Sequence, residues 1–225
     1  MGKVMILNGS PRAPKSNSKK YSEIFMKYSR LQCDYFNITK SNHLKLIAEI
    51  ENYSDVIIVF PLYADSLPVG LLNFLKNLEN NLPVQRLVIS ILINCGFLEF
   101  EQNSVAVNMI RYFCRRNNFP IGSTLMLGSG EAILDTPFRY IAVRAIKRLS
   151  ESVNKGNYKD ISATMPLPKW LFKMAASSYW ISYGKKFGVS EKEMLLQYLQ
   201  PDITQYFVRN KSEICHRPLR VHSKG

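Results

Sequence analysis

The sequence VMILNGSPRAPKSNSKK, residues 4–20, decides how this 225-residue chain is expected to fold. Residues 4–7 are all apolar, which is typical of a short strand buried on both faces of a parallel sheet. Residues 8–10 then turn the chain, and a helix is predicted from about residue 19 to residue 31. Because a helix start offers unpaired backbone N–H groups and the positive end of a dipole, this loop is a candidate phosphate site.

Two better-known phosphate loops do not fit this stretch. Residues 9–16, GSPRAPKS, differ from the G-x-x-x-x-G-K-[ST] pattern of nucleoside triphosphatases by Pro14 at the second glycine. Proline has no N–H group to bind phosphate and cannot adopt a positive φ. The dinucleotide pattern G-x-G-x-x-G fails because Pro11 and Pro14 cannot replace its glycines. What remains is a hydroxyl-rich loop suited to a phosphate monoester, with Ser10, Arg12, Ser16, Asn17 and Ser18 as its candidate ligands.

Alternating strands and helices follow this loop. Apolar runs predict strands at residues 33–38, 56–60, 87–93 and 122–127, and helical spacing predicts helices between them. One of these helices begins at Pro68, and the residues on its apolar face are Val69, Leu72, Leu75 and Leu78. The pattern predicts an α/β fold with a doubly wound, five-stranded parallel sheet of strand order 2-1-3-4-5. In that order the loops after the first and third strands are neighbours, where such sheets bind ligands.

Two of these loops carry a resemblance to a known family. N-G-S-P-R followed by S-N-S in the first loop, and P-L-Y after the third strand, resemble the flavodoxin-like NAD(P)H-dependent FMN and quinone reductases. The resemblance is specific over roughly residues 1–155, and it implies that residues 1–157 form an FMN-binding domain. It places the FMN phosphate on the first loop, where Arg12 adds positive charge. The alternative interpretation is that Arg12 is an exposed loop arginine with no role in binding.

The resemblance also implies where the flavin ring lies. The ring is expected along the second loop, at Pro61, Leu62, Tyr63, Ala64 and Asp65. Backbone contacts to its pyrimidine side are expected from the third loop, at Asn94, Cys95, Gly96 and Phe97. As an alternative, Leu62 and Tyr63 close the top of the core, and Cys95 is a packed small residue.

Few side chains are candidates for acid–base or metal chemistry. The three histidines, His43, His216 and His222, lie outside the predicted site loops, so a histidine-centred hydrolase has little support. The four cysteines form no cluster of metal spacing, so we expect no metal site and no iron–sulfur cluster. Loop carboxylates on the same edge, Asp65, Glu99 and Glu131, are assigned no catalytic role. Flavin reduction needs no acid–base side chain, since hydride passes directly from nicotinamide to the flavin.

The amino-acid composition limits which binding partners and which cellular location are expected. Thirty Lys and Arg against seventeen Asp and Glu give a net charge of +13, which favours anionic partners. No nucleic-acid motif accompanies the charge, so specific nucleic-acid binding is not expected. The longest apolar tract, residues 167–183, is interrupted by Lys169 and Lys173, so no membrane span is expected. Free thiols and the missing signal peptide predict a cytoplasmic protein.

Residues 158–225 are predicted to form a helical extension and a basic tail. A helix is expected over residues 170–186, a capping box at Ser190 and Glu193 opens a second helix to Leu199, and residues 209–225 form the tail. The first of these helices could cover the flavin, pack in a dimer or lie on a membrane surface. We favour packing within a dimer or over the core, because aromatic amphipathic helices usually bury against protein.

These observations favour an enzyme. The chain is expected to be an FMN-dependent NAD(P)H oxidoreductase that passes electrons to a flavin, a quinone or another aromatic acceptor, as a homodimer like many of the resembling reductases. A flavodoxin-like electron carrier is an alternative, against which the basic charge and the extra helical third weigh. A non-catalytic flavin-binding regulatory protein also remains open.

Overall fold

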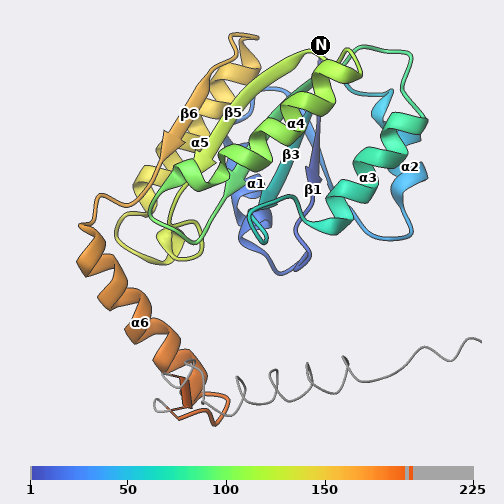
Figure 1. The fold of residues 1–225 in the computed structure, drawn as a ribbon. Coiled ribbons are helices and arrows are strands. Elements are labelled where there is room, and N and C mark those ends of the chain that lie inside the picture. The colour runs from blue at the N-terminus through green and yellow to red at the C-terminus, as the bar shows by residue number, and fades with distance from the viewer. Residues whose placement is uncertain (1, 191–192, 195–225) are drawn as a thin grey trace, which may run out of the picture. The chain divides into compact units, whose positions relative to one another are not determined.

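The structure, a computed structural model, describes residues 2–190 and 193–194, and Figure 1 shows its ribbon. The chain divides after Pro166 into two compact units. The first unit holds a parallel sheet of six strands in the order β2-β1-β3-β4-β5-β6. The strands are β1 Lys3–Asn8, β2 Gln32–Asn37, β3 Asp55–Pro61, β4 Val88–Asn94, β5 Ile121–Leu127 and β6 Asp160–Ala163.

The central strands are apolar throughout because helices cover both faces of the sheet. Side chains of α2, α3 and α4 join one buried cluster with Met5, Ile58 and Ile91, while α1 and α5 contact each other and the strands on the opposite face. Such two-sided burial explains why β3 and β4 show no polar alternation. The helices are α1 Asn17–Tyr28, α2 His43–Ile50, α3 Val69–Asn80, α4 Ser104–Arg116 and α5 Arg139–Asn154.

The strand count predicted from the sequence is wrong by one. β6 pairs with β5 in parallel register, with Thr124 opposite Asp160 and Leu127 opposite Ala163. It lies in the segment assigned to the helical extension. Its four residues, DISA, bury Ile161 alone, so neither a continuous apolar run nor a clear alternation marks it as a strand. The predicted order of the first five strands is confirmed.

The face that α3 turns to the core also differs from the prediction. Leu75 and Leu78 are buried as expected, but Val69 is 68 % exposed. The remaining buried side chains of the helix are those of Leu71 and Phe74. The buried positions 71, 74, 75 and 78 fit the helical period as well as the predicted positions 69, 72, 75 and 78 do. Packing of α3 against α2 and the sheet decides which of the two sets is buried.

The second unit contains the predicted extension helix, α6 Lys169–Lys185. After it, Ser190 and Glu193 form the predicted capping box: the Ser190 N–H and hydroxyl donate to Glu193 Oε2 at 2.8 and 2.6 Å, and Glu193 N–H donates to Ser190 Oγ at 3.3 Å. The continuation to Leu199 and the basic tail lie outside the described residues. Within residues 2–190 and 193–194, none of the helices combines the length and hydropathy that crossing a bilayer requires.

Candidate functional site

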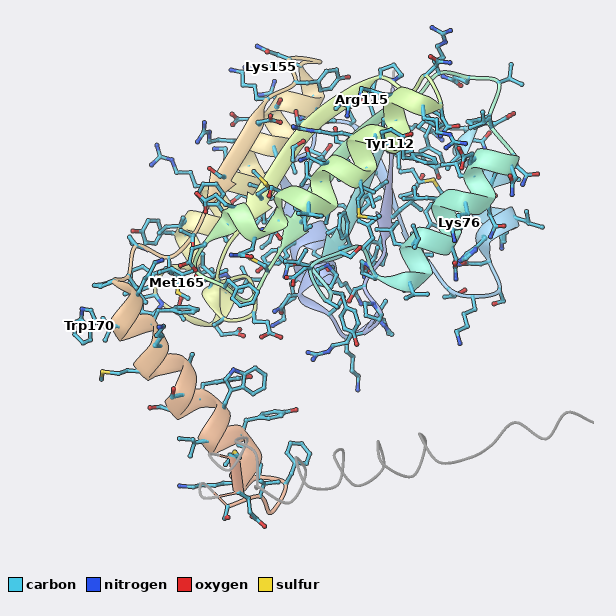
Figure 2. The ribbon with its side chains drawn as sticks, viewed as in Figure 1. Lys76, Tyr112, Arg115, Lys155, Met165 and Trp170 are labelled. Atoms are coloured by element: carbon cyan, nitrogen blue, oxygen red, sulfur yellow. The ribbon has the colours of Figure 1, made fainter. Side chains whose placement is uncertain are left out.

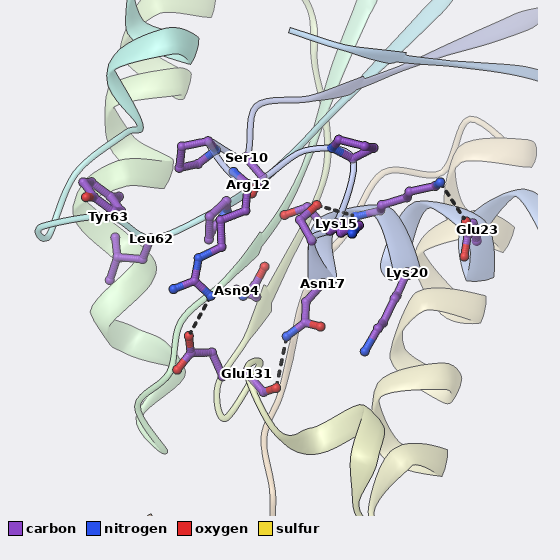
Figure 3. A pocket seen from close by; sticks show the side chains of 16 residues that line it. Ser10, Arg12, Lys15, Asn17, Lys20, Glu23, Leu62, Tyr63, Asn94 and Glu131 are labelled. Atoms are coloured by element: carbon purple, nitrogen blue, oxygen red, sulfur yellow. Dashed lines mark hydrogen bonds and ion pairs between the residues drawn. The ribbon is translucent and has the colours of Figure 1, made fainter. Parts of the chain in front are cut away.

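A cavity of about 590 Å³ opens at the carboxyl ends of β1, β3 and β4 (Figure 3). The sheet register brings its three loops together, because Gly9 N–H donates to Val59 O at 2.9 Å and Leu62 N–H donates to Asn94 O at 2.7 Å. The predicted adjacency of the first two loops is therefore present. The cavity is lined by Ser10, Pro11, Arg12, Pro14, Lys15, Ser16, Asn17, Ser18, Lys19, Lys20, Glu23, Pro61, Leu62, Tyr63, Asn94 and Glu131.

The buried side chain of Asn8 organises the first loop. Its Oδ1 accepts from Ser10 N–H at 2.9 Å, and its Nδ2 donates to Ser16 Oγ at 3.2 Å and to the Tyr35 hydroxyl at 2.7 Å. Ser10 Oγ in turn accepts from Arg12 N–H at 3.3 Å. Asn8 thus joins both ends of the loop to the neighbouring strand, a supporting role that the sequence analysis did not assign.

Helix α1 begins two residues earlier than predicted. Ser16 is its N-cap, with Oγ accepting from Lys19 N–H at 3.2 Å, so Asn17 and Ser18 belong to the first turn. Their backbone N–H groups have no carbonyl partner within the helix. Ser18 is 2 % exposed, and its Oγ is buried without a hydrogen-bond partner. Because buried hydroxyls are normally hydrogen-bonded, this group points to a ligand.

The side chain of Asn17 is tied to the loop after β5. Its Nδ2 donates to the carbonyls of Gly130 and Glu131 at 3.1 and 3.0 Å, and Tyr21 donates its hydroxyl to Gly130 O at 2.5 Å. Asn17 therefore fixes a fourth loop against α1, and its backbone N–H is the group left for an anion. A Cβ on Gly130 would lie 2.6 Å from that of Asn94, so this loop also packs closely behind the third one.

Glu131 and Arg12 form an ion pair across the cavity, with 3.9 Å between Oε1 and Nη1 (Figure 3). Glu131 was noted in the sequence only as a loop carboxylate without a role. The lining carries four cationic side chains and two carboxylates, an excess of two positive charges. The cavity wall is thus suited to an anionic ligand. The charged lining residues are Arg12, Lys15, Lys19, Lys20, Glu23 and Glu131.

The second loop contributes its first half to the cavity. Pro61, Leu62 and Tyr63 line it, and the Tyr63 side chain is 59 % exposed. Ala64 and Asp65 do not line it: both have positive φ, 47° and 55°, and form the tip of a two-residue turn. Tyr63 and Ser66 close the turn through two backbone hydrogen bonds of 3.1 and 3.0 Å.

The third loop contributes Asn94 alone. Asn94 is 3 % exposed, and its buried Oδ1 has no hydrogen-bond partner. Cys95 points inward, where burial raises the pKa of its thiol and Asn103 Nδ2 lies 3.5 Å from Sγ. The carbonyls of Cys95 and Phe97 accept from Gly130 and Ser129 N–H groups at 2.7 and 2.5 Å. The predicted residues Cys95, Gly96 and Phe97 are therefore not brought into the cavity lining.

No family model and no curated protein matches this sequence. Solved structures do match its fold. An azoreductase from Bacillus anthracis str. Sterne aligns with a TM-score of 0.53 at 14 % identity, covering 69 % of this chain and 100 % of its own. The NADPH-quinone reductase from P. pentosaceus aligns with a TM-score of 0.52 at 13 % identity, covering 67 % of this chain and 98 % of its own. The flavodoxin of Streptococcus pneumonia has the same TM-score and identity, and covers 68 % of this chain and 99 % of its own. This chain has a flavodoxin-like fold. The resemblance found in the sequence is thus confirmed at the level of the fold.

The cavity occupies the switch point of this flavodoxin-like fold, where the strand order reverses between β1 and β3. No described histidine lines it: His43 is buried in α2 against Asn77, and His216 and His222 lie outside the described residues. Over the same part of the chain, no three His, Cys, Asp or Glu side chains are placed to hold a metal ion. Tyr21 is the buried titratable group behind the lining, and desolvation raises the pKa of its phenol. The site therefore offers donors and positive charge for binding.

Proposed function

We propose that this protein is an FMN-dependent NAD(P)H oxidoreductase. The observation that carries the proposal is the unpartnered hydroxyl of Ser18 at the start of α1, in one cavity with the exposed ring of Tyr63 and the unpartnered amide oxygen of Asn94. A phosphate monoester suits the first feature, and an aromatic ring with polar edges suits the other two. FMN combines both groups in one molecule.

The loop hydroxyls fit a phosphate group. Ser10 Oγ and Ser16 Oγ already accept hydrogen bonds from backbone N–H groups, so their hydrogens remain available to donate to phosphate oxygens. Ser18 Oγ and the N–H groups of the first turn of α1 add further donors. Arg12 supplies charge once it turns from Glu131 to the phosphate.

The remaining lining fits a flat ring. Leu62 and Tyr63 would contact its faces, and Asn94 Oδ1 would accept from an N–H at its edge. Bound FMN supplies the chemistry of this enzyme class, since it accepts hydride from NAD(P)H and passes the electrons on. The protein then needs to bind, orient and shield the ring, which agrees with the lack of a described histidine in the cavity lining.

The neighbours in fold include both enzymes and carriers. One is an azoreductase, another an NADPH-quinone reductase and a third a flavodoxin. We therefore propose a flavin, a quinone or another aromatic compound as the acceptor, and a homodimer in the cytoplasm as the working form. The positively charged cavity favours a nicotinamide nucleotide as electron donor, because the phosphate groups of NADH and NADPH are anionic.

An absorbance experiment tests the proposal. Purified protein is titrated with FMN and with riboflavin, then mixed anaerobically with NADH or NADPH. We expect FMN to bind more tightly than riboflavin, and the flavin absorbance to bleach with one or both nucleotides. Flavin that binds but is not bleached would favour the electron carrier. Failure to bind FMN would overturn the proposal, and equal binding of riboflavin would overturn the phosphate assignment.

A further inference from the structure

Helix α4 buries one side against the core and exposes a row of side chains on the other, which we call its outer stripe (Figure 2). The row begins in the 3₁₀-helix Phe100–Asn103 that leads into α4. Its members are three or four residues apart, as expected for one side of a helix. Two large side chains of the stripe, Val105 and Tyr112, are 58 % and 60 % exposed. The outer stripe comprises Glu101, Val105, Asn108, Tyr112 and Arg115, all of them exposed.

The outer stripe has opposite charges at its two ends. Glu101 and Arg115 each lie seven residues from Asn108, so the acidic and the basic group are placed evenly about the middle of the stripe. Neither side chain forms an ion pair within residues 2–190 and 193–194. The neighbouring Arg116 is already paired, with 2.9 Å between its Nε and Glu79 Oε1. Glu101 and Arg115 are therefore the charges of this side of α4 that can meet a partner.

This arrangement of charges is complementary to itself. A second α4 that packs antiparallel, related by a two-fold axis at Asn108, places Glu101 of each copy opposite Arg115 of the other. The same axis brings the apolar side chain of Val105 in each copy close to Tyr112 of the other. Antiparallel packing also sets the dipoles of the two helices in opposite directions, which is the favourable arrangement.

Partners with one sign of charge fit the outer stripe less well. An anionic surface would attract Arg115 and repel Glu101, and a cationic surface would do the reverse. Like charges placed across an interface oppose association. Charge complementarity therefore favours a second copy of this chain as the occupant.

We propose that α4 forms the interface of a homodimer in which two outer stripes pack antiparallel across a two-fold axis. The apolar side chains would lie at its centre, and two Glu101–Arg115 ion pairs would fix the orientation of the copies. Ser66 Oγ donates to Met109 Sδ at 3.4 Å, so α4 contacts the second loop of the cavity and the interface adjoins that loop. The proposal rests on the homodimer proposed above and not on flavin binding.

Charge reversal tests the predicted ion pairs. Sedimentation equilibrium of the full chain without flavin measures the dissociation constant of the dimer. Glu101→Arg and Arg115→Glu should each raise it by about 30-fold or more, because each substitution makes two symmetric contacts repulsive. The two substitutions change the net charge in opposite directions, so a general charge effect would not weaken the dimer in both variants.

Mixing the two variants tests whether the contacts are reciprocal. In a mixed dimer of Glu101→Arg with Arg115→Glu, each of the two contacts again joins a carboxylate to a guanidinium. We expect the mixture to dimerise about as tightly as the unaltered chain, at concentrations where each variant alone is monomeric. The matched controls are Glu151→Arg and Arg148→Glu at exposed positions of α5, which should leave the dissociation constant nearly unchanged.

Each other result would overturn the proposal. An unaltered chain that stays monomeric at the highest concentration tested would exclude the dimer itself, whether or not FMN binds. A dimer of equal stability in both charge-reversal variants would assign the contact to another surface. Variants that are folded by circular dichroism but do not associate when mixed would exclude the antiparallel pairing of Glu101 with Arg115.

Discussion

Arg12 and Glu131 face each other across the cavity, with 3.9 Å between Nη1 and Oε1. The two residues come from the loops after β1 and β5, far apart in the sequence. Their side chains are 77 % and 50 % exposed, so the pair contributes little to folding stability. Its consequence concerns binding: a ligand phosphate must compete with Glu131 for the guanidinium of Arg12.

Removing that competition should tighten FMN binding. We expect Glu131→Gln to raise the affinity for FMN by up to about fivefold, because an exposed ion pair contributes at most about 1 kcal/mol. The affinity for riboflavin, which has no phosphate, should not change. Fluorescence titration at low and high salt measures both. The charge control is Glu79→Gln, which removes a carboxylate of α3 that pairs with Arg116 of α4. A lower FMN affinity in Glu131→Gln would contradict the competition between Glu131 and the ligand phosphate.

The hydroxyl of Ser18 should matter for binding and not for folding. Ser18→Ala removes a buried group without a partner, so the free energy of unfolding should stay the same or rise slightly. Loss of a hydrogen bond to a phosphate should weaken FMN binding by roughly 10- to 100-fold. The control is Ser22→Ala on the same helix: its Oγ donates to Ser18 O at 2.8 Å, so stability should fall while FMN affinity stays unchanged. The opposite pattern would refute the assignment.

Gly130 should tolerate no side chain. A Cβ there would lie 2.6 Å from the Cβ of Asn94, and relieving such an overlap costs about 1–3 kcal/mol. Gly130→Ala should therefore lower the free energy of unfolding in urea and displace Asn94. Gly70→Ala is the matched control, since nothing lies within 4 Å of its Cβ position in α3 and alanine favours helix. We expect it to raise stability by up to about 1 kcal/mol; equal effects of both substitutions would exclude the packing argument.

Alkaline pH should destabilise the fold through Cys114. Burial raises the pKa of its thiol to about 12 from an ordinary value near 9. Unfolding above pH 9 thus ionises a group that stays protonated in the native state, so stability falls as pH rises from about 9 toward 12. The contribution is about 1.4 kcal/mol at pH 10. Urea unfolding at pH 8 and pH 10 should show a smaller decline for Cys114→Ala than for Cys33→Ala, whose thiol is only half buried. Equal declines would contradict this assignment.

Much of the sheet could be predicted because its central strands are unusually simple in sequence. The runs in β3 and β4 are apolar on both faces, and these strands end at Pro61 and Asn94, one residue beyond the predicted ends. β6 was missed because four residues with one buried side chain give no periodic signal. Val69 was misplaced because two apolar stripes of α3 share the helical period, and packing selects one of them.

The candidate site was predictable where a loop follows its own strand, as for Ser10, Ser16, Ser18 and Tyr63. It was not predictable where distant segments meet. The hydrogen bonds from Asn17 to the carbonyls of Gly130 and Glu131 join residues 113 and 114 positions apart, and no local pattern encodes them. For the same reason Glu131, which lines the cavity, resembled any solvated loop carboxylate in the sequence.

The position of both tryptophans in α6 gives the protein an internal distance measurement. Residues 1–166 contain no tryptophan, so a flavin bound in the cavity would be the energy acceptor for donors located solely in the second unit. Resonance energy transfer from Trp170 and Trp180 to bound FMN would then follow the separation of the two units without any added label.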